Sequence, residues 1–466
     1  MSKILLKFDN QLEHQDIVIQ LTNSSKDEAG ENYVDNKQEI QQTLIYGIQA
    51  PLIKINNIVV DFIDVIEFSL KSVNDLPTIN MIVKDRYNLT RLVDTPGNDN
   101  LLRVQILPQF DNTYKKIDLD FFITSLKINN DYISITGSYK LPKLTSSNIK
   151  SFGEINTFDL FETIATDTGL GFATNVETND INKKYVYCDN KSYLDILNRE
   201  IRYSSEDKYI LDFWVDFWNN LNLVNIYERY NSIDSDEDMM IWVSSQTKEI
   251  REGIVPEPMQ ITATLTNHPN MASNELYVQN YKIINNAGQN SFRGTDRVYS
   301  IYEIDKHEYM DHLIQDGDVK KDIFVKYDYL GESYGGFNYL LAEKIRSDFL
   351  TKMQTESIEV ELNTPLLGLM RGNNVNFVSY INDSNTDYRQ QNLIDNGVMN
   401  QSPEQSVPLE DEDSKQTGED KFIIDNSISG QYTICGCNIK FSNNKWSYLV
   451  NLKRPASNKP QLINEQ

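Results

Sequence analysis

Cysteine and histidine are scarce in this chain of 466 residues, which contains 3 Cys and 4 His. Three cysteines in this length exclude a disulfide framework. Cys435 and Cys437 alternate in one apolar run, so we expect small buried residues on the same strand face, with a redox pair as the alternative. His307 and His312 are five residues apart, whereas a zinc helix needs histidines four apart. The sequence therefore predicts no metal site and no cofactor.

Long apolar runs are also lacking, and basic residues are fewer than acidic residues. The apolar stretch at the N-terminus is too short for a signal peptide, and no window approaches the length of a transmembrane helix, so we expect no membrane insertion. The 68 acidic residues outnumber the 44 basic residues, which gives a formal net charge of −24. This balance repels phosphate backbones, so tight binding to nucleic acid is not expected.

The usual motifs of catalytic sites are missing as well. Gly169 and Gly171 lack the spacing of a phosphate-binding loop, and Gly169 is placed instead to end a helix that begins near Thr157. The acidic run Asp234–Asp238 has no glycine at the sixth position of a calcium loop. No G-x-S-x-G elbow occurs, and Cys188 lies in no nucleophile motif. The sequence thus gives no positive evidence for an enzyme.

Short apolar runs separated by pairs of asparagine are the most frequent pattern. Asn tolerates the positive φ that tight hairpins require. The pairs lie at 56–57, 129–130, 219–220 and 443–444. Helical patterns are fewer: one follows Thr157, a second begins with capping-box spacing at Ser192, and a third covers Asn338–Met353. We therefore predict a mainly β protein in which two antiparallel β regions flank a mixed α+β segment.

Aromatic residues are abundant, above all in the run "LDFWVDFW". Alternation places Trp214 and Trp218 with two carboxylates on one face of this strand, which suits a contact with another chain or domain; the alternative is that both cover helices of their own domain. Trp446 and Tyr448 share a face of the last predicted strand. We take these four residues as candidates for a protein interface.

Three stretches in the middle of the chain resemble, in their order, the inserted domain of phage tail baseplate hub proteins, a family that includes the N-terminal hub region of VgrG spike proteins. The stretches are "FDLFETIATDTGLGFATN", "KSYLDILNREIRYSS" and "DFWVDFWNNLNLVNIY". The run from Ala50 to Arg86 is similar to the first tube domain of that family. "NTPLLGLMRGNNVNF" and "ISGQYTICGCNIKFSNNKWSYLVNLKR" are similar to the second.

The resemblance implies two similar tube-type antiparallel β-barrels flanking the mixed domain. The expected division is an N-terminal arm and linker (1–49), the first barrel (50–146), the inserted α+β domain (147–256), a β-rich segment with a connecting helix (257–354), the second barrel (355–379 and 421–456), an acidic insertion loop (380–420) and a C-terminal tail (457–466). No needle repeat follows Arg454, so the spike is expected to be a separate polypeptide.

The resemblance also implies a function. In the family a homotrimer forms a ring of six barrels, which joins a sixfold tail tube to a threefold spike and surrounds the channel for DNA exit during genome ejection. The expected partners are further copies of this chain, the tail tube protein, the spike protein and baseplate wedge proteins. The expected location is the virion tail baseplate, after assembly in the host cytoplasm. A receptor- or glycan-binding tail protein is the alternative, and a peptidoglycan hydrolase is disfavoured because no separate catalytic domain is found.

Overall fold

The structure is a computed structural model of the chain. It describes residues 4–12, 14, 17, 50–56, 58–86, 100–107, 116–129, 131–176, 184–205, 209–231, 264–267, 275–285, 297–314, 326–333, 338–353, 356–363, 365, 369–382, 422–424 and 428–454. Strands predominate over helices in these residues, which confirms the predicted mainly β fold class. The run Asp234–Asp238 and residues 383–420 of the predicted acidic insertion lie outside the described residues.

The largest sheet contains 14 strands and includes strands from both predicted β regions. Its strands from the N-terminal region are β2 (Leu52–Ile55), β3 (Ile58–Val60), β4 (Val65–Ser72), β5 (Thr78–Lys84), β6 (Leu101–Ile106), β7 (Ile117–Asn129) and β8 (Tyr132–Tyr139). Its strands from the C-terminal region are β14 (Thr264–Thr266), β15 (Glu275–Tyr277), β16 (Asn280–Asn285), β20 (Glu356–Leu362), β21 (Asn374–Val378), β24 (Gly430–Ser442) and β25 (Lys445–Arg454).

The same strand order occurs twice in this sheet. In the first half-sheet the spatial order is β4-β5-β8-β7-β6, and in the second half-sheet it is β16-β20-β25-β24-β21. The corresponding strands also follow one another in the same order along the chain, and all neighbours within each half-sheet are antiparallel. The likeness ends at the next strand, because β2 joins β6 antiparallel whereas β14 joins β21 parallel. The predicted pair of barrels stays a prediction, since the described strands form one continuous sheet.

Asparagine makes the tight turns, as the sequence predicts. Asn56, Asn219, Asn443 and Asn444 have φ between 50° and 61°, a region that asparagine enters more easily than other residues with a side chain. The hairpin β24–β25 turns at Asn443 and Asn444, whereas in the hairpin β7–β8 Asn129 is the last residue of β7. Local sequence therefore fixes where the strands reverse and which residues face one another.

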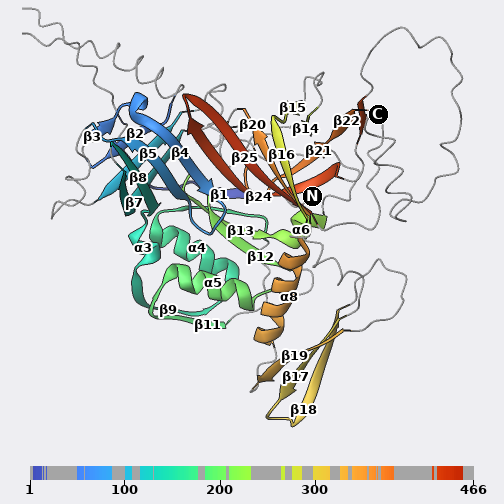
Figure 1. The fold of residues 1–466 in the computed structure, drawn as a ribbon. Coiled ribbons are helices and arrows are strands. Elements are labelled where there is room, and N and C mark those ends of the chain that lie inside the picture. Colours follow the sequence, from blue (N-terminus) through green and yellow to red (C-terminus); the bar gives the residue numbers. More distant parts are fainter. Residues whose placement is uncertain are drawn as a thin grey trace, which may run out of the picture.

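The mixed segment contains two further sheets and several helices, which lie below the large sheet (Figure 1). A four-stranded sheet has the order β1-β10-β13-β12, and β9 pairs with β11 in a separate ribbon. The strands are β1 (Leu5–Phe8), β9 (Ser147–Ile155), β10 (Gly171–Thr174), β11 (Lys184–Ser192), β12 (Leu211–Val215) and β13 (Asn220–Asn225). The helices are α3 (Pro142–Thr145), α4 (Thr157–Thr168), α5 (Tyr193–Tyr203) and α6 (Ile226–Asn231). Part of the predicted N-terminal arm is thus the edge strand β1.

The ends of α4 and α5 follow from their sequence. Gly169 ends α4 in the left-handed region with φ 80°, and the amide of Leu170 donates to the carbonyl of Ala165, as in a Schellman motif. Ser192 caps α5 in a reciprocal capping box with Asp195. Both features are as predicted, except that α4 is capped by Asn156, one residue earlier than expected.

Replacing Gly169 with alanine is expected to lower the free energy of unfolding by about 1 kcal/mol, because a Cβ disfavours the left-handed region. A Cβ at this position would lie in ordinary contact, 3.4 Å from Leu12 Cδ2, so backbone strain and not overpacking is the cause. Denaturant unfolding measures the change. Thr166→Ala, on the exposed face of α4, is the control and is expected to change stability by less than about 0.5 kcal/mol. An equal loss in both variants would contradict the prediction.

A long helix and a small three-stranded sheet extend together from the rest of the fold (Figure 1). Helix α8 covers Asn338–Met353, as predicted, and packs against a three-stranded sheet of order β18-β17-β19. These strands are β17 (Arg297–Glu303), β18 (Glu308–Ile314) and β19 (Lys326–Ser333). His307 lies in the β17–β18 turn and His312 on β18, so the segment is a strand hairpin. None of the described helices has the length and apolar character needed to cross a membrane.

Candidate assembly interface

The two half-sheets are joined by a backbone seam between β24 and β4. Residues Cys437–Ser442 of β24 pair antiparallel with Ser72–Glu67 of β4, with Ile439 opposite Leu70. The first part of β24 pairs instead with β21, at Asn374–Phe377. The long strand β24 therefore changes its neighbour halfway along, from a strand of its own half-sheet to a strand of the other.

Aromatic packing closes the inner face of this seam. Phe441 lies directly opposite Phe68 across the seam, and both side chains are fully buried. The ring of Trp446 contacts both edge-on, with centroids 5.1 Å from Phe441 and 6.4 Å from Phe68. Such edge-to-face pairs add about 0.5–1.5 kcal/mol each to the burial of the rings. The seam is thus part of the hydrophobic core.

A polar row lines the outer face of the same seam. Ser69 Oγ and Asn438 Oδ1 are 2.8 Å apart and form a buried hydrogen bond in which the serine donates. Asn438 also lies directly opposite Lys71, and Lys440 lies opposite Ser69. No lysine therefore faces another lysine directly across the ladder, an arrangement that avoids like-charge repulsion between opposed residues.

Each half-sheet also has an edge with no neighbour among the described residues. Strand β7 pairs with β6 through Ile117–Phe122, and the amide of Ile123 donates to Asn100, so that Ser125–Asn129 have β8 on one side alone among the described residues. Strand β16 pairs with β20 alone. Ile128 on β7 is 62% exposed and Ile283 on β16 is 46% exposed. Two open strand edges with exposed apolar side chains are candidates for pairing with another chain.

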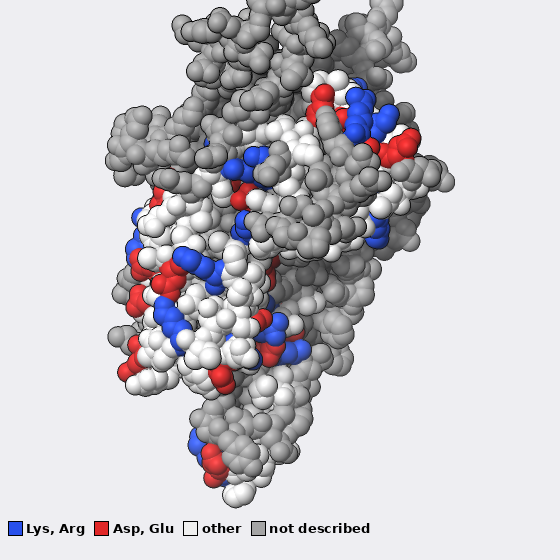
Figure 2. Space-filling model, turned by 90° about the vertical axis from the view of Figure 1, so that its left-hand side faces the viewer, with Lys and Arg blue, Asp and Glu red and all other residues white. Residues whose placement is uncertain are grey.

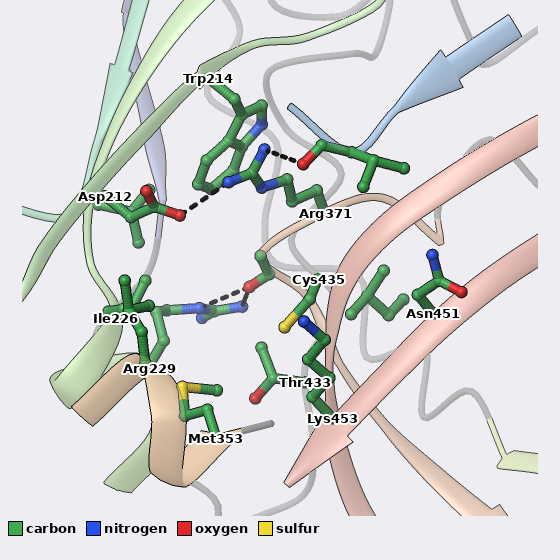
Figure 3. Close-up of a pocket in the computed structure, with 15 residues that line it drawn as sticks. Asp212, Trp214, Ile226, Arg229, Met353, Arg371, Thr433, Cys435, Asn451 and Lys453 are labelled. Atoms are coloured by element: carbon green, nitrogen blue, oxygen red, sulfur yellow. Dashed lines mark hydrogen bonds and ion pairs between the residues drawn. The ribbon is translucent and has the colours of Figure 1, made fainter. Parts of the chain in front are cut away.

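An ion-paired junction ties the second half-sheet to the four-stranded sheet of the mixed segment (Figure 3). The guanidinium of Arg371 stacks on the ring of Trp214 at 4.6 Å and binds the carboxylate of Asp212 at 2.8 Å. It also donates to the backbone carbonyls of Val73 and Asn74, beside the end of β4. One arginine therefore connects three parts of the fold.

A second arginine at this junction, Arg229, is buried. Both Nε and Nη2 of Arg229 donate to the carbonyl of Gly372, at 2.8 and 2.7 Å. Burial lowers the pKa of Arg229 to about 10, which still leaves it charged near neutral pH. Gly372 itself has φ 88°, and a Cβ there would lie 3.0 Å from the Trp214 ring. Glycine at 372 is thus favoured by both the turn and the close packing.

A cavity of about 230 Å³ lies between these two arginines, α8 and the β24–β25 hairpin. Its lining combines apolar side chains such as Ile226 and Met353 with Cys435 and Lys453 (Figure 3). Arg371 and Arg229 already bind groups of this chain, as described above. The cavity therefore belongs to the junction between parts of one chain.

Removing the junction's ion pair is expected to cost stability in a coupled way. Arg371→Ala and Asp212→Asn should each lower the free energy of unfolding by about 1–3 kcal/mol, and the double variant should lose less than the sum. Because both side chains are partly buried, we expect this ion pair to contribute more to the free energy of unfolding than a surface salt bridge does. Denaturant unfolding of the four proteins in the double-mutant cycle measures the coupling. Strict additivity would contradict a direct interaction.

The four predicted interface residues are all buried within the chain. Their exposed fractions are 3% for Trp214, 4% for Trp218, 9% for Trp446 and 0% for Tyr448. Trp214 contacts Arg371 and Trp446 packs in the β24–β4 seam, so these two residues connect parts of one chain. A role of the four residues between chains stays a prediction. With one ring face under Arg371, Trp214 offers no open platform for a sugar, which removes the reason for the glycan-binding alternative at this residue.

The three cysteines are all free thiols. Cys435 and Cys437 do not share a strand face, contrary to the prediction, because β24 is bulged between Ile434 and Gly436. Cys437 lies in the core beside Tyr448, and burial raises its pKa to about 11, whereas Cys435 lines the cavity. Among the described residues, no group of three or more metal-ligating side chains comes together.

Comparison with known proteins gives similarity in structure only. No family model matches the chain, and no curated protein matches its sequence. Solved structures to which the chain is similar include phage tail proteins and components of type VI secretion systems or VgrG complexes.

Three of these structures illustrate the likeness. They are a tail protein from Neisseria meningitidis MC58 (TM-score 0.45, 10% identity, 87% of this chain and 96% of that chain), the 43 kDa tail protein of prophage MuSo2 from Shewanella oneidensis (0.49, 8%, 87% and 98%) and the E. coli c3393 protein, a component of the type VI secretion system (0.39, 11%, 87% and 77%). No residue role, partner or assembly is transferred from them, since the TM-scores are below 0.5.

Proposed function

We propose that this chain is a non-enzymatic structural protein of a phage tail, the central hub of the baseplate, and that it works as a homotrimer. The observation that carries the proposal is the repeated strand order of the two half-sheets, which are joined through the β24–β4 seam. A chain that contains two equivalent units side by side contributes two units to any ring it forms.

The duplication has a structural consequence when the chain forms a symmetric ring. Three copies related by threefold symmetry would present six similar units around one axis. Such a ring can match a sixfold tail tube on one side and a threefold spike on the other. The proposed partners are therefore the tail tube protein, the spike protein and the surrounding wedge proteins, and the proposed location is the baseplate of the virion.

The outer face of the half-sheets suits the wall of a channel for DNA. On β8, alternation points Ser134, Thr136 and Ser138 away from the core, while Ile133 and Ile135 point into it. These hydroxyl groups expose little apolar surface and carry no positive charge to hold a polyanion, although Lys71 and Lys440 lie on the same face at the seam. On the side of the molecule seen in Figure 2, described Lys and Arg residues are interspersed with Asp and Glu. No single-sign basic patch that would retain nucleic acid is apparent among these residues.

Native mass measurement of the purified chain tests the proposal. The expected species has three times the chain mass of 53.9 kDa, and it should bind separately purified tail tube and spike proteins. A chain that stays monomeric at micromolar concentration, alone and with both partners, would contradict the proposal. A zymogram on peptidoglycan is the control for function, and clearing by this chain would contradict the non-enzymatic part.

A further inference from the structure

The open edges of β7 and β16 have the same chemistry as the two strands that already meet in the β24–β4 seam. We infer that Ser125–Lys127 of β7 in one copy pair antiparallel with Asn280–Lys282 of β16 in a neighbouring copy, with Leu126 opposite Tyr281, and so repeat this seam between chains. The inference rests on the proposed function, because it supplies the contact that holds the ring together.

The hairpins show which residues of β7 and β24 correspond. Leu126 lies opposite Ile135 in the β7–β8 hairpin, and Ile439 lies opposite Tyr448 in the β24–β25 hairpin. In both pairs the two residues are nine positions apart and flank a two-residue turn, so Leu126 corresponds to Ile439. The correspondence holds from Ser125 to the turn, since β7 is bulged between Ile123 and Ser125.

The next strands show which residues of β4 and β16 correspond. In the first half-sheet Leu70 lies opposite Ile79, which lies opposite Gly137. In the second half-sheet Tyr281 lies opposite Val360, which lies opposite Val450. Gly137 follows Leu126 by 11 residues, and Val450 follows Ile439 by 11 residues, so Gly137 corresponds to Val450. Tyr281 therefore corresponds to Leu70, and the register of one seam can be transferred to the other.

The transferred register brings together the same polar residues. The existing seam places the tripeptide Ser69–Lys71 (SLK) against Asn438–Lys440 (NIK). The inferred seam places Ser125–Lys127 (SLK) against Asn280–Lys282 (NYK). Serine and asparagine have exchanged strands, so a serine–asparagine hydrogen bond like that of the existing seam can form. Each lysine again lies opposite a serine or an asparagine, which avoids like-charge repulsion.

The inner face of the inferred seam explains apolar side chains that are otherwise exposed. Ile128 corresponds to Phe441 by position in the hairpin, yet Ile128 is 62% exposed whereas Phe441 is fully buried. Tyr281, which corresponds to the fully buried Leu70, is only partly buried. A neighbouring chain paired at this edge would cover these residues, as β4 covers Phe441 within the chain.

The two edges differ, so the contact runs head to tail. The β7 edge of one copy binds the β16 edge of the next, which leaves one open edge of each kind at the ends of any unclosed row. Such a heterologous contact either closes into a ring or continues as a filament. Closure at three copies would leave none of these edges open.

Cysteine cross-linking between separately purified single variants tests the seam. Leu126→Cys and Tyr281→Cys are mixed, allowed to assemble and oxidised, and assembly of each variant is verified beforehand by native mass. The expected result is a covalent dimer in the mixture that is absent from either variant alone, which also controls for the three native cysteines. Ser125→Cys with Lys282→Cys, on the opposite face, is the second pair and should also cross-link.

An out-of-register pair is the matched control. Ile128→Cys with Ile283→Cys lies on the same face, but the inferred register separates the two positions by four residues along the strand, about 13 Å, which is too far for a disulfide. A native trimer in which neither in-register pair cross-links, or in which the control pair does, would overturn the seam and leave the proposed function standing. A cross-link formed only inside one chain would overturn it as well. A wild-type chain that never assembles would overturn both.

Discussion

Replacing Asp216 with alanine is expected to lower the free energy of unfolding by about 3–5 kcal/mol, one of the largest single-residue effects in the chain. Asp216 is 5% exposed, and its carboxylate holds the β12–β13 turn together. Oδ1 accepts hydrogen bonds from the amides of Trp218 (2.8 Å) and Asn220 (2.9 Å), and Oδ2 accepts one from Asn220 Nδ2 (3.0 Å). Alanine would leave two buried amides without this acceptor.

The effect should extend beyond the turn. Asn219, inside this turn, accepts a hydrogen bond of 2.6 Å from the hydroxyl of Tyr139 at the end of β8. Loss of the turn geometry therefore loosens the contact between the mixed segment and the first half-sheet. Denaturant unfolding measures the change. Asp189→Ala, an exposed aspartate on β11, is the control and should change stability by less than about 0.5 kcal/mol. Similar losses in both variants would contradict the special role of Asp216.

Asp216 should also leave a signature in the pH dependence of stability. Burial raises its pKa above the ordinary value of 3.8, although the hydrogen bonds from Asn220 and Trp218 oppose the shift. The folded state therefore binds this proton at a higher pH than the unfolded state does. The contribution of Asp216 is most favourable below the unfolded pKa and falls as pH rises through the folded pKa. Asp216→Asn should remove this component, and unchanged pH dependence in that variant would contradict the assignment.

Local features of the fold are predictable from the sequence because they depend on a few neighbouring residues. The asparagine turns, the end of α4 at Gly169 and the capping box at Ser192 all follow from the conformational preferences of single residues. The stripe on α8, with Leu341 and Ile345 buried, follows from helical periodicity.

Features that depend on register or on distant segments were missed. The bulge in β24 reverses the alternation, so that Cys435 and Cys437 face different surroundings although they are two residues apart. A polar side of the β12 strand that suggested an outer interface is covered by Arg371, which is more than 150 residues away in the sequence. Strand β1 pairs with β10 from within a segment that composition indicates to be a linker.

The residues of the seam could likewise not be recognised from the sequence alone. The tripeptides SLK at 69–71 and 125–127 are visible in the sequence, but three residues are too few to indicate a repeat. Their meaning depends on the strand register, which places each SLK against a tripeptide of the form Asn-x-Lys in the existing or the inferred seam. Only the three-dimensional pairing distinguishes this match from chance.

Replacing Ile128 with aspartate is expected to weaken assembly at least 100-fold and to leave the folded monomer intact. The side chain is 62% exposed in the single chain, so its loss should cost folding less than about 0.5 kcal/mol. In the inferred seam it is covered by the neighbouring copy, where an unpaired carboxylate costs about 3–5 kcal/mol. Sedimentation or native mass at several concentrations measures the association, and denaturant unfolding measures the fold.

Two matched variants separate assembly from folding. Ile149→Asp makes the same chemical change at an isoleucine that is 86% exposed on β9, and it should leave assembly unchanged. Phe441→Ala, at the corresponding position of the seam inside the chain, should lower the free energy of unfolding by about 3–5 kcal/mol because this ring is fully buried. One structural position would then govern association in the first half-sheet and folding in the second. If Ile128→Asp instead unfolds the chain, or assembles like the wild type, the edge of β7 is not the contact between copies.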